Sequence, residues 1–357
     1  MPPTEPLRRR LRRRLSGRGT MAGRTTLAIG GAGSIAVVHS LAAMAAGWRT
    51  TVVASAGGSS ARHLAGQLDA RRVRPDQLPA GADVLVVASP PHAHVDLALQ
   101  GLEAGARVLV EKPVAPTLAD ADRLVDAVAS CGDPDRLRVA ENLLHAPAWR
   151  RWRSERPALG QLGHLSARAL QPAPDWGHFT RRLTSGGVLF DLGPHPIALV
   201  LETASSVPTG VRAELESNRD DGADDRAVVE IDLTTGTVAT VELRWGGDEV
   251  AWDVQAAGPD GSLRLELLPN LELTRDGHPL ELVRRHDPVD PRLEDLGYVD
   301  QLLDLVDDPD IGQDVATARH VLELICAAYA SAGAGGTTVP LPFTGDRRAT
   351  PMQLWRD

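Results

Sequence analysis

The distribution of apolar and polar positions divides the chain near residue 142. Before that point, short apolar runs alternate with longer stretches in which apolar residues recur at helical spacing. Such runs are typical of parallel strands buried on both faces, and the stretches between them of helices that cover the sheet. The pattern therefore predicts a right-handed parallel α/β sheet. Its strands are expected over 25–30, 50–54, 83–88, 107–110 and 137–140. Its helices are expected after the glycine turn up to residue 46 and over 59–68, 92–104 and 117–129.

Beyond residue 142, runs with the appearance of strands follow one another, separated by turns rich in Gly, Asp and Asn. This arrangement predicts a largely antiparallel sheet and an α+β second half. The strands are expected over 162–170, 211–216, 227–233, 237–243, 251–256 and 262–267, with helices over 194–202, 293–306 and 315–331.

The length of 357 residues is about twice that of a usual domain and agrees with two domains. We expect a disordered extension over 1–20, an α/β domain over 21–142 and an α+β domain over 143–357. No apolar run is long enough to cross a bilayer, so we expect no membrane association. The two cysteines, Cys131 and Cys326, are too few for a disulfide framework, which favours a cytoplasmic protein.

Charge is distributed unevenly along the chain. Residues 1–20 carry a net charge of +6, and the remainder carries −15. An acidic body disfavours nucleic acid as a partner, because phosphate binding needs a basic face. The basic start has no apolar segment behind it, so we do not expect it to be a signal peptide. A disordered extension or an upstream start codon is the simpler interpretation, and an arm that binds polyanions is the alternative.

Lys112 is the single lysine among 38 basic residues. A Walker phosphate loop is excluded, because Pro113 rather than Ser or Thr follows Lys112. Arginine is a permanently charged fork, whereas lysine is a compact donor whose pKa can be tuned. A chain that uses arginine at every other basic position therefore indicates a chemical role for the ammonium group of Lys112. Chance survival of one lysine codon is the alternative.

A glycine motif, Gly31-x-Gly33-x-x-Ala36, lies between the first expected strand and the first expected helix. In dinucleotide-binding units the first glycine makes the turn, the second admits the pyrophosphate, and the third small residue lets helix and strand pack closely. N–H groups at the helix start bind the phosphates, which adds Ser34 and Ile35 to the candidate site. The first domain is thus predicted to be a Rossmann dinucleotide-binding domain. A glycine turn with no nucleotide is the alternative.

The end of the second strand bears on the choice of cofactor. An NAD-binding domain commonly has a carboxylate there for the ribose hydroxyl, but this chain has Ser55. The absence of a carboxylate, with Arg62 nearby, favours NADP over NAD. Arg62 can equally be a solvated helix residue, so NAD stays open.

Further motifs follow in a fixed order. They are Ser89-Pro90-Pro91-x-x-His94, Glu111-Lys112-Pro113, residues 142–147 and Gly186-Gly187-x-x-x-Asp191-x-Gly193-x-His195. With these motifs the chain resembles the Gfo/Idh/MocA oxidoreductases over nearly all of residues 25–340. It implies a Rossmann domain, a second domain built on a large, mostly antiparallel sheet, and NAD(P)-dependent oxidation or reduction of a secondary alcohol or ketone. The substrate would be a sugar, a cyclitol or a related natural product.

The resemblance also implies roles for individual residues. His195 would be the acid/base group, and imidazole suits removal of a hydroxyl proton. Lys112, at the end of a parallel strand, would hold the reacting oxygen, and Asp191 would orient the imidazole or bind a substrate hydroxyl. The cofactor would also contact Ser89, Pro90, His94, Glu111 and Lys112. The substrate would contact Asn142, Trp176, His178, Asp191 and His195.

The chain departs from the family pattern at two positions. Leu144 replaces an arginine common in the family, and Ala198 replaces an aspartate. These changes favour a less anionic substrate than a sugar acid. His145, His164 and His178 have spacings that suit no metal site, so we expect no metal.

Two other functions stay open. The chain could be a catalytically silent regulator that senses a dinucleotide, or an enzyme that uses its cofactor transiently to hydrolyse or epimerise a glycoside. Intact Lys112, Asp191 and His195 argue against the regulator. The resemblance further implies assembly into a homodimer or homotetramer through the sheet of the second domain. Five apolar residues favour the same conclusion, because they are too many for one buried face: Val228, Ile231, Val238, Val241 and Leu243.

Overall fold

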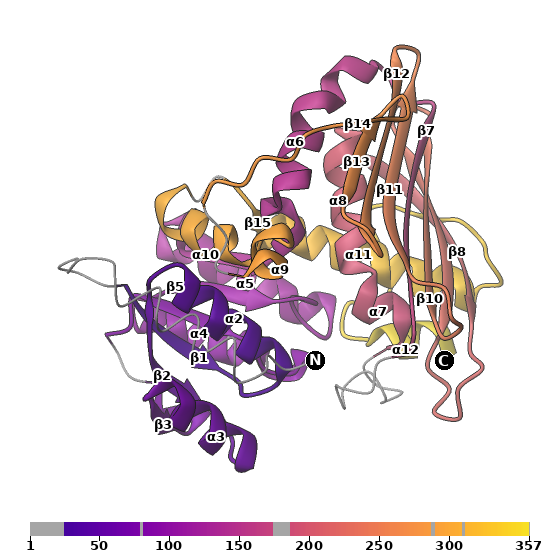
Figure 1. The fold of residues 1–357 in the computed structure, drawn as a ribbon. Coiled ribbons are helices and arrows are strands. Elements are labelled where there is room, and N and C mark those ends of the chain that lie inside the picture. The colour runs from indigo at the N-terminus through magenta and orange to yellow at the C-terminus, as the bar shows by residue number, and fades with distance from the viewer. Residues whose placement is uncertain (1–24, 79–80, 174–185, 287–289, 309–310, 357) are drawn as a thin grey trace. The chain divides into compact units, whose positions relative to one another are not determined.

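The computed structural model describes residues 25–78, 81–173, 186–286, 290–308 and 311–356. The basic extension over 1–20 and the candidate substrate residues Trp176 and His178 lie outside the described residues. Figure 1 shows the order of the elements along the chain. Among the described residues, no helix combines the length and the apolar character needed to cross a membrane.

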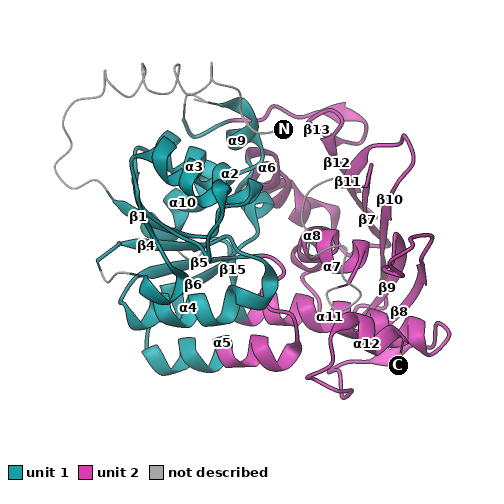
Figure 2. Ribbon diagram, turned by 90° about the horizontal axis from the view of Figure 1, so that it is seen from below, with its two compact units in different colours: residues 1–111, 124–146, 284–315 teal, residues 112–123, 147–283, 316–357 magenta. Residues whose placement is uncertain are grey.

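Two compact units make up the structure (Figure 2). Unit 1 comprises residues 1–111, 124–146 and 284–315, and unit 2 comprises 112–123, 147–283 and 316–357. These units differ from the continuous domains expected from the sequence. The segment 284–315 joins unit 1 although it lies late in the chain, and the short segment that begins with Lys112 joins unit 2.

A seven-stranded sheet forms the centre of unit 1, in the order β15-β6-β5-β4-β1-β2-β3. All neighbours are parallel except β15, which pairs antiparallel with β6. The strands are β1 (Thr26–Gly30), β2 (Arg49–Ala54), β3 (Arg71–Val73), β4 (Val84–Val87), β5 (Arg107–Glu111), β6 (Leu137–Ala140) and β15 (Gln313–Asp314). The helices are α2 (Ser34–Ala45), α3 (Ser59–Leu68), α4 (His94–Glu103), α9 (Pro291–Asp295), α10 (Tyr298–Asp307) and the part of α5 (Leu118–Cys131) that falls in this unit. Six parallel strands in this order are the Rossmann arrangement, so the predicted fold class is confirmed.

The apolar runs of the first half form the core of unit 1. Helices α2 and α10 lie on one face of the sheet and α4 lies on the other (Figure 2). The strands β1, β4 and β5 are therefore buried on both faces, with Leu27, Ile29 and Val86 fully buried. The strands β3 and β15 were not expected, because runs of two or three residues are too short to show a period.

The helix expected over 293–306 is divided into α9 and α10. Gly297 separates the two with a φ of +78°, a conformation that favours glycine. A Cβ atom added at Gly297 would lie 2.2 Å from the carbonyl oxygen of Asn142. The close approach of the turn beginning at Asn142 thus requires glycine, and this contact is not visible in the local sequence.

A nine-stranded sheet forms unit 2, in the order β14-β13-β12-β11-β7-β10-β9-β8-β16. All neighbouring strands are antiparallel except β7 and β10, which are parallel. The prediction of a mostly antiparallel sheet is therefore confirmed. The strands are β7 (His164–Gln171), β8 (Pro208–Glu216), β9 (Arg226–Leu233), β10 (Val238–Trp245), β11 (Ala251–Gly258), β12 (Gly261–Leu268), β13 (Glu272–Arg275), β14 (His278–Pro279) and β16 (Val339–Pro340). The helices are α6 (Pro147–Glu155), α7 (Val188–Leu192), α8 (Pro194–Ala204), α11 (Val315–Gly333, almost all in this unit) and α12 (Pro351–Arg356).

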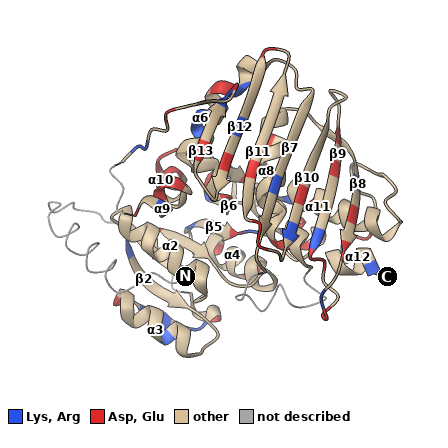
Figure 3. Ribbon diagram, turned by 45° about the vertical axis from the view of Figure 1, so that its right-hand side comes forward, with Lys and Arg blue, Asp and Glu red and all other residues tan. Residues whose placement is uncertain are grey.

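The two faces of this sheet differ in chemistry. Helices α6, α7 and α8 pack on one face, where Ile231, Val241 and Leu243 are fully buried. Charged residues lie along several strands of the sheet (Figure 3), and Arg168 on β7 pairs with Asp253 on β11 at 2.5 Å on the other face. Val238 is 45% exposed and Val228 is half-buried. Helices of the same unit therefore cover Ile231, Val241 and Leu243, and only Val228 and Val238 of the five lie on the other face. Assembly through that face stays a prediction.

Candidate active site

Lys112 follows β5 directly, and its side chain binds Asp191 within unit 2. Its Nζ atom donates to the backbone oxygen of Asp191 at 2.8 Å and lies 3.4 Å from Oδ1 of the same residue. The peptide bond between Lys112 and Pro113 is cis. Two contacts to one residue hold the ammonium group at a defined position beside a carboxylate. A guanidinium fork of different size and geometry would not reproduce them.

Asp191 and His195 lie one helical turn apart. Gly193, between α7 and α8, keeps a helical backbone with φ −54° and ψ −34°, and its N–H donates to Leu189 O at 3.1 Å. Residues four apart on a helix lie on the same side, so Asp191 and His195 face one region. The helix α8 was predicted, but α7 was not, because five residues are too few to show a helical period.

Trp252 contributes an aromatic wall that sequence reasoning missed. Its ring lies 5.8 Å from the imidazole of His195, inclined at 55°. Its Nε1 donates to Oε1 of Gln171 at 3.2 Å, which fixes the indole from the neighbouring strand β7. His195 is only 8% exposed. No local signal marks Trp252, because its position beside His195 results from the packing of α8 on β11.

The glycine turn of unit 1 fits a dinucleotide. Gly31 has φ +140°, and a Cβ added there would lie 2.1 Å from Ala88 O, so only glycine allows β1 and β4 to end so close together. A Cβ added at Gly33 would meet nothing within 4 Å, which leaves room for a pyrophosphate. Helix α2 begins there with no side-chain cap and no acidic residue in its first turn. The N–H groups of Ser34 and Ile35 are suited to an anion.

Ser89, Pro90 and His94 form the second turn at this edge of the sheet. His94 is buried, and its Nε2 donates to Ser89 O at 2.7 Å, which ties the start of α4 to the end of β4. The Oγ atom of Ser89 is buried and has no hydrogen-bond partner among the described residues. An orphaned hydroxyl in this place is consistent with a ligand that supplies the missing partner.

Two other candidate residues make bonds inside unit 1. Glu111 is buried and pairs with His39 Nε2 at 2.7 Å, and the ring of Tyr298 packs edge-on against the same imidazole. Burial, together with the charge of Glu111, raises the pKa of Tyr298. Asn142 is also buried and donates from Nδ2 to Leu296 O at 2.7 Å. Through these contacts Glu111 and Asn142 stabilise the fold of this unit.

The ribose end of the cofactor site has no carboxylate on β2. Ser55 follows this strand and donates its N–H to Val73 O at 3.1 Å. Arg62 is exposed on the first turn of α3. Three more arginines, Arg71, Arg72 and Arg74, lie along and just after β3, and all are exposed. Arg74 already pairs with Asp76 at 3.1 Å. Arginine side chains therefore outnumber the carboxylates in this segment of unit 1.

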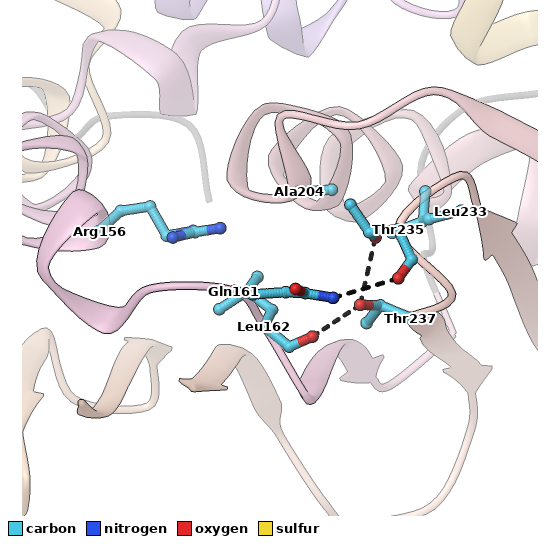
Figure 4. Close-up of a pocket in the computed structure, with 7 residues that line it drawn as sticks. All are labelled: Arg156, Gln161, Leu162, Ala204, Leu233, Thr235 and Thr237. Carbon is cyan, nitrogen blue, oxygen red and sulfur yellow. Dashed lines mark hydrogen bonds between the residues drawn. The ribbon is translucent and has the colours of Figure 1, made fainter. Parts of the chain in front are cut away.

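A cavity of about 360 Å³ occupies another part of unit 2 (Figure 4). Its lining residues bind the protein itself: Gln161 Nε2 donates to Thr235 O at 3.2 Å, and Thr237 Oγ1 donates to Leu162 O at 2.6 Å. Ala204, at the end of α8 opposite to His195, also lines it. The lining contains no carboxylate or imidazole, so we assign no catalytic role to this cavity.

In the described part of the chain, no group of three His, Cys, Asp or Glu side chains could hold a metal ion.

Two family models match the chain, one before residue 142 and one after it. Residues 25–134 match a model described as an oxidoreductase family with an NAD-binding Rossmann fold. Residues 153–264 match the GFO/IDH/MocA C-terminal domain. Together the two models span more than half of the chain.

Known proteins resemble the chain over different lengths. D-glucoside 3-dehydrogenase of Escherichia coli (strain K12) is 34% identical over 116 residues, or 32% of this chain and 33% of that protein. A protein of Amycolatopsis mediterranei (strain S699), provisionally described as a UDP-kanosamine synthase oxidoreductase subunit, is 30% identical over 70% of this chain and 79% of its own length. The structure of GenD2 from gentamicin A biosynthesis, in complex with NAD, is 25% identical with a TM-score of 0.75, covering 91% of this chain and 98% of that one. The matching sheets, motifs and relatives show that the chain belongs to the GFO/IDH/MocA oxidoreductase family.

Proposed function

We propose that the protein is an NAD(P)-dependent oxidoreductase acting on a secondary alcohol or ketone of a sugar, cyclitol or related natural product. The observation that carries the proposal is the contact of the Lys112 ammonium group with Asp191, one helical turn before His195. A cationic donor, a carboxylate and an imidazole are the groups that oxidation of an alcohol needs from the protein.

The three side chains divide the work of the reaction. In the oxidative direction, His195 accepts the hydroxyl proton of the substrate at an imidazole nitrogen. Lys112 donates to the substrate oxygen and stabilises the negative charge that develops there. Asp191 holds the ammonium group in place and supplies an acceptor for a neighbouring substrate hydroxyl. A nicotinamide cofactor would supply the acceptor for the hydride that leaves as the C–H bond breaks and the C=O bond forms. In the reductive direction, His195 returns the proton.

Two observations support a sugar-like substrate. The indole of Trp252 beside His195 offers a flat apolar surface, which suits the C–H face of a ring that carries hydroxyl groups on its rim. The relatives are named for a D-glucoside, for UDP-kanosamine and for gentamicin A biosynthesis. The neutral residues Leu144 and Ala198 favour an uncharged substrate over a sugar acid.

The cofactor is either NADP or NAD. Gly31, Gly33, Ser34 and Ile35 would hold the pyrophosphate, and Ser55 would stand beside the adenosine ribose. The lack of a carboxylate at Ser55 and the excess of arginine around it favour NADP. The solved structure of GenD2 contains NAD, and this keeps NAD as the alternative.

The decisive experiment combines binding with turnover. Purified protein is first screened by thermal shift with NAD and NADP, since a ligand that binds the folded state raises the melting temperature. It is then incubated with the preferred cofactor and a panel of glycosides and cyclitols. We expect a ketone product together with an equal amount of reduced cofactor. Cofactor binding without any product would favour a regulator, and a hydrolysed or epimerised glycoside with no net reduced cofactor would favour transient use.

A further inference from the structure

Helix α7, which carries Asp191, begins at a single buried aspartate from another part of the chain. Gly187 N donates to Asp224 Oδ1 at 2.9 Å, and Leu189 N donates to Asp224 Oδ2 at 2.8 Å. Between them, Val188 N donates to the backbone oxygen of Asp224 at 2.8 Å. The first N–H groups of a helix have no partner within the helix. Here Asp224, in the loop before β9, provides a partner for three in succession.

Tyr329, from the long helix α11, completes this arrangement. Its hydroxyl donates to Asp224 Oδ1 at 2.6 Å and accepts from Gly187 N at 3.2 Å. Asp224 and Tyr329 are both fully buried. Among the described residues, each partner of the Asp224 carboxyl oxygens is a donor. This suits the ionised carboxylate, whereas a protonated carboxyl would need an acceptor. Burial raises the pKa of Asp224, and the hydrogen bonds from Leu189 and Tyr329 act against this effect.

The two glycines of the motif are required by the same contacts. A Cβ atom added at Gly187 would lie 2.0 Å from Asp224 O. A Cβ atom added at Gly186, where φ is +102°, would lie 2.5 Å from Phe190 Cβ and 3.1 Å from the Tyr329 hydroxyl. The glycines therefore let the chain approach Asp224 and Tyr329 closely enough to be bound by them.

The position of α7 decides where Lys112 is held. A helix of five residues is unstable by itself, so its place depends on its bonds to the rest of the protein. Asp224 binds its first turn, and Asp191 N closes that turn on Gly187 O at 3.0 Å. At the other end, the oxygen of Asp191 accepts from Lys112. A shift of the first turn would displace both Asp191 and the acceptor of Lys112.

We propose that Asp224 and Tyr329 are positioning residues that hold α7 so that Asp191 meets Lys112. The value of this arrangement for turnover rests on the function proposed above, but the positioning itself does not. It can be tested without a substrate, because Lys112 is the only lysine of the chain and an amine reagent therefore reports on one side chain.

The experiment measures how fast acetic anhydride labels Lys112 in the full-length protein. The peptide that contains Lys112 is followed by mass spectrometry, which separates it from the labelled N-terminal amine. The variants are Tyr329→Phe, which removes only the hydroxyl, and Asp224→Asn, which replaces one acceptor oxygen by a donor. We expect labelling to rise about fivefold in both, the factor that corresponds to losing one net hydrogen bond to the ammonium group.

Ser331→Ala is the matched control. Ser331 lies two residues after Tyr329 on α11, is fully buried, and accepts from Ala213 N at 3.0 Å on β8 rather than from α7. Its removal should cost similar stability and leave the labelling rate unchanged. If Asp224→Asn does not fold, Tyr329→Phe carries the test alone. An unchanged rate in folded Tyr329→Phe, or an equal rise in Ser331→Ala, would overturn the proposal. A protein without dehydrogenase activity would still give the expected labelling, so the two proposals fail separately.

Discussion

At the scale of single residues, Lys112 is the most informative position. Its ammonium group binds the backbone and approaches the carboxylate of one residue, Asp191. Lys112→Arg keeps the charge but enlarges the head group and fixes its donors in a fork. If Lys112 holds the reacting oxygen, turnover should fall about a hundredfold or more, the effect of losing one donor to the transition state. Turnover is measured with the substrate found by screening.

The controls for this prediction separate chemistry from binding. The dissociation constant of the cofactor should change little in Lys112→Arg. His195→Ala should lose turnover to a similar extent and recover part of it at high pH, where hydroxide can replace the base. Turnover close to that of the wild type in Lys112→Arg would show that the single lysine has no special role.

Ser55 provides a second prediction at this scale. Ser55→Asp places a negative charge at the end of β2, where it would repel a 2′-phosphate and attract a ribose hydroxyl. We expect the wild type to bind NADP more tightly than NAD and the variant to reverse this order, as measured by titration with both cofactors. Ser130→Asp, which adds the same charge at an exposed position on α5, should leave the order unchanged. A wild type that prefers NAD would contradict the prediction.

At the scale of elements, a buried carboxylate binds helix α10 to neighbouring segments of unit 1. Asp304 on this helix accepts from His145 Nδ1 at 2.7 Å and also pairs with Arg285. Burial raises the pKa of Asp304, but the bonds and charges of His145 and Arg285 outweigh it and leave the pKa below its ordinary value. A carboxyl whose pKa is lower in the folded state stabilises the fold above its unfolded pKa. It loses this contribution as the pH falls through the folded pKa.

Asp304→Asn should therefore destabilise the protein in a pH-dependent way. At neutral pH we expect a loss of about 3 kcal/mol in the free energy of unfolding, typical of a buried pair that loses one partner. The difference from the wild type should shrink at about pH 3, where the carboxylate is increasingly protonated. Urea unfolding at both pH values measures it. Asp307→Asn, at the exposed end of the same helix, should have little effect at either pH. A loss that is equal at the two pH values would rule out the carboxylate as its cause.

At the scale of the whole molecule, the second sheet presents a face that no helix of the described part of unit 2 covers. Ion pairs between strands, such as Arg168 with Asp253 and Arg212 with Glu230, run across it, and Val238 is exposed at the start of β10. Resemblance to the family implies that such faces pack against each other in dimers or tetramers. We expect a dimeric or tetrameric mass by light scattering at micromolar concentration. A strictly monomeric mass would count against assembly through this face.

The sequence alone was sufficient for most of the elements and for the outline of the site. Helix 59–68 and strand 137–140 were predicted with the bounds observed, because burial of one face or of both leaves a period that the local sequence records. The glycine turn at Gly31 was also predictable, since its position requires glycine. Lys112 was singled out as the one lysine of the chain, and its role stays a prediction. The motif that ends at His195 identified the family by resemblance.

Other features depended on contacts between distant segments, which leave no periodic trace. The break at Gly297 results from the approach of Asn142, and β15 forms only where it can pair with β6. Asp224 lies 37 residues from Gly187, and Tyr329 lies 105 residues from Asp224. A buried carboxylate is stable only when donors surround it, and here those donors come from α7 and α11. The candidate reacting groups were thus predicted from the sequence, whereas the contacts that join α7 to Asp224 and Tyr329 came from the tertiary structure alone, because they require three remote segments to pack together.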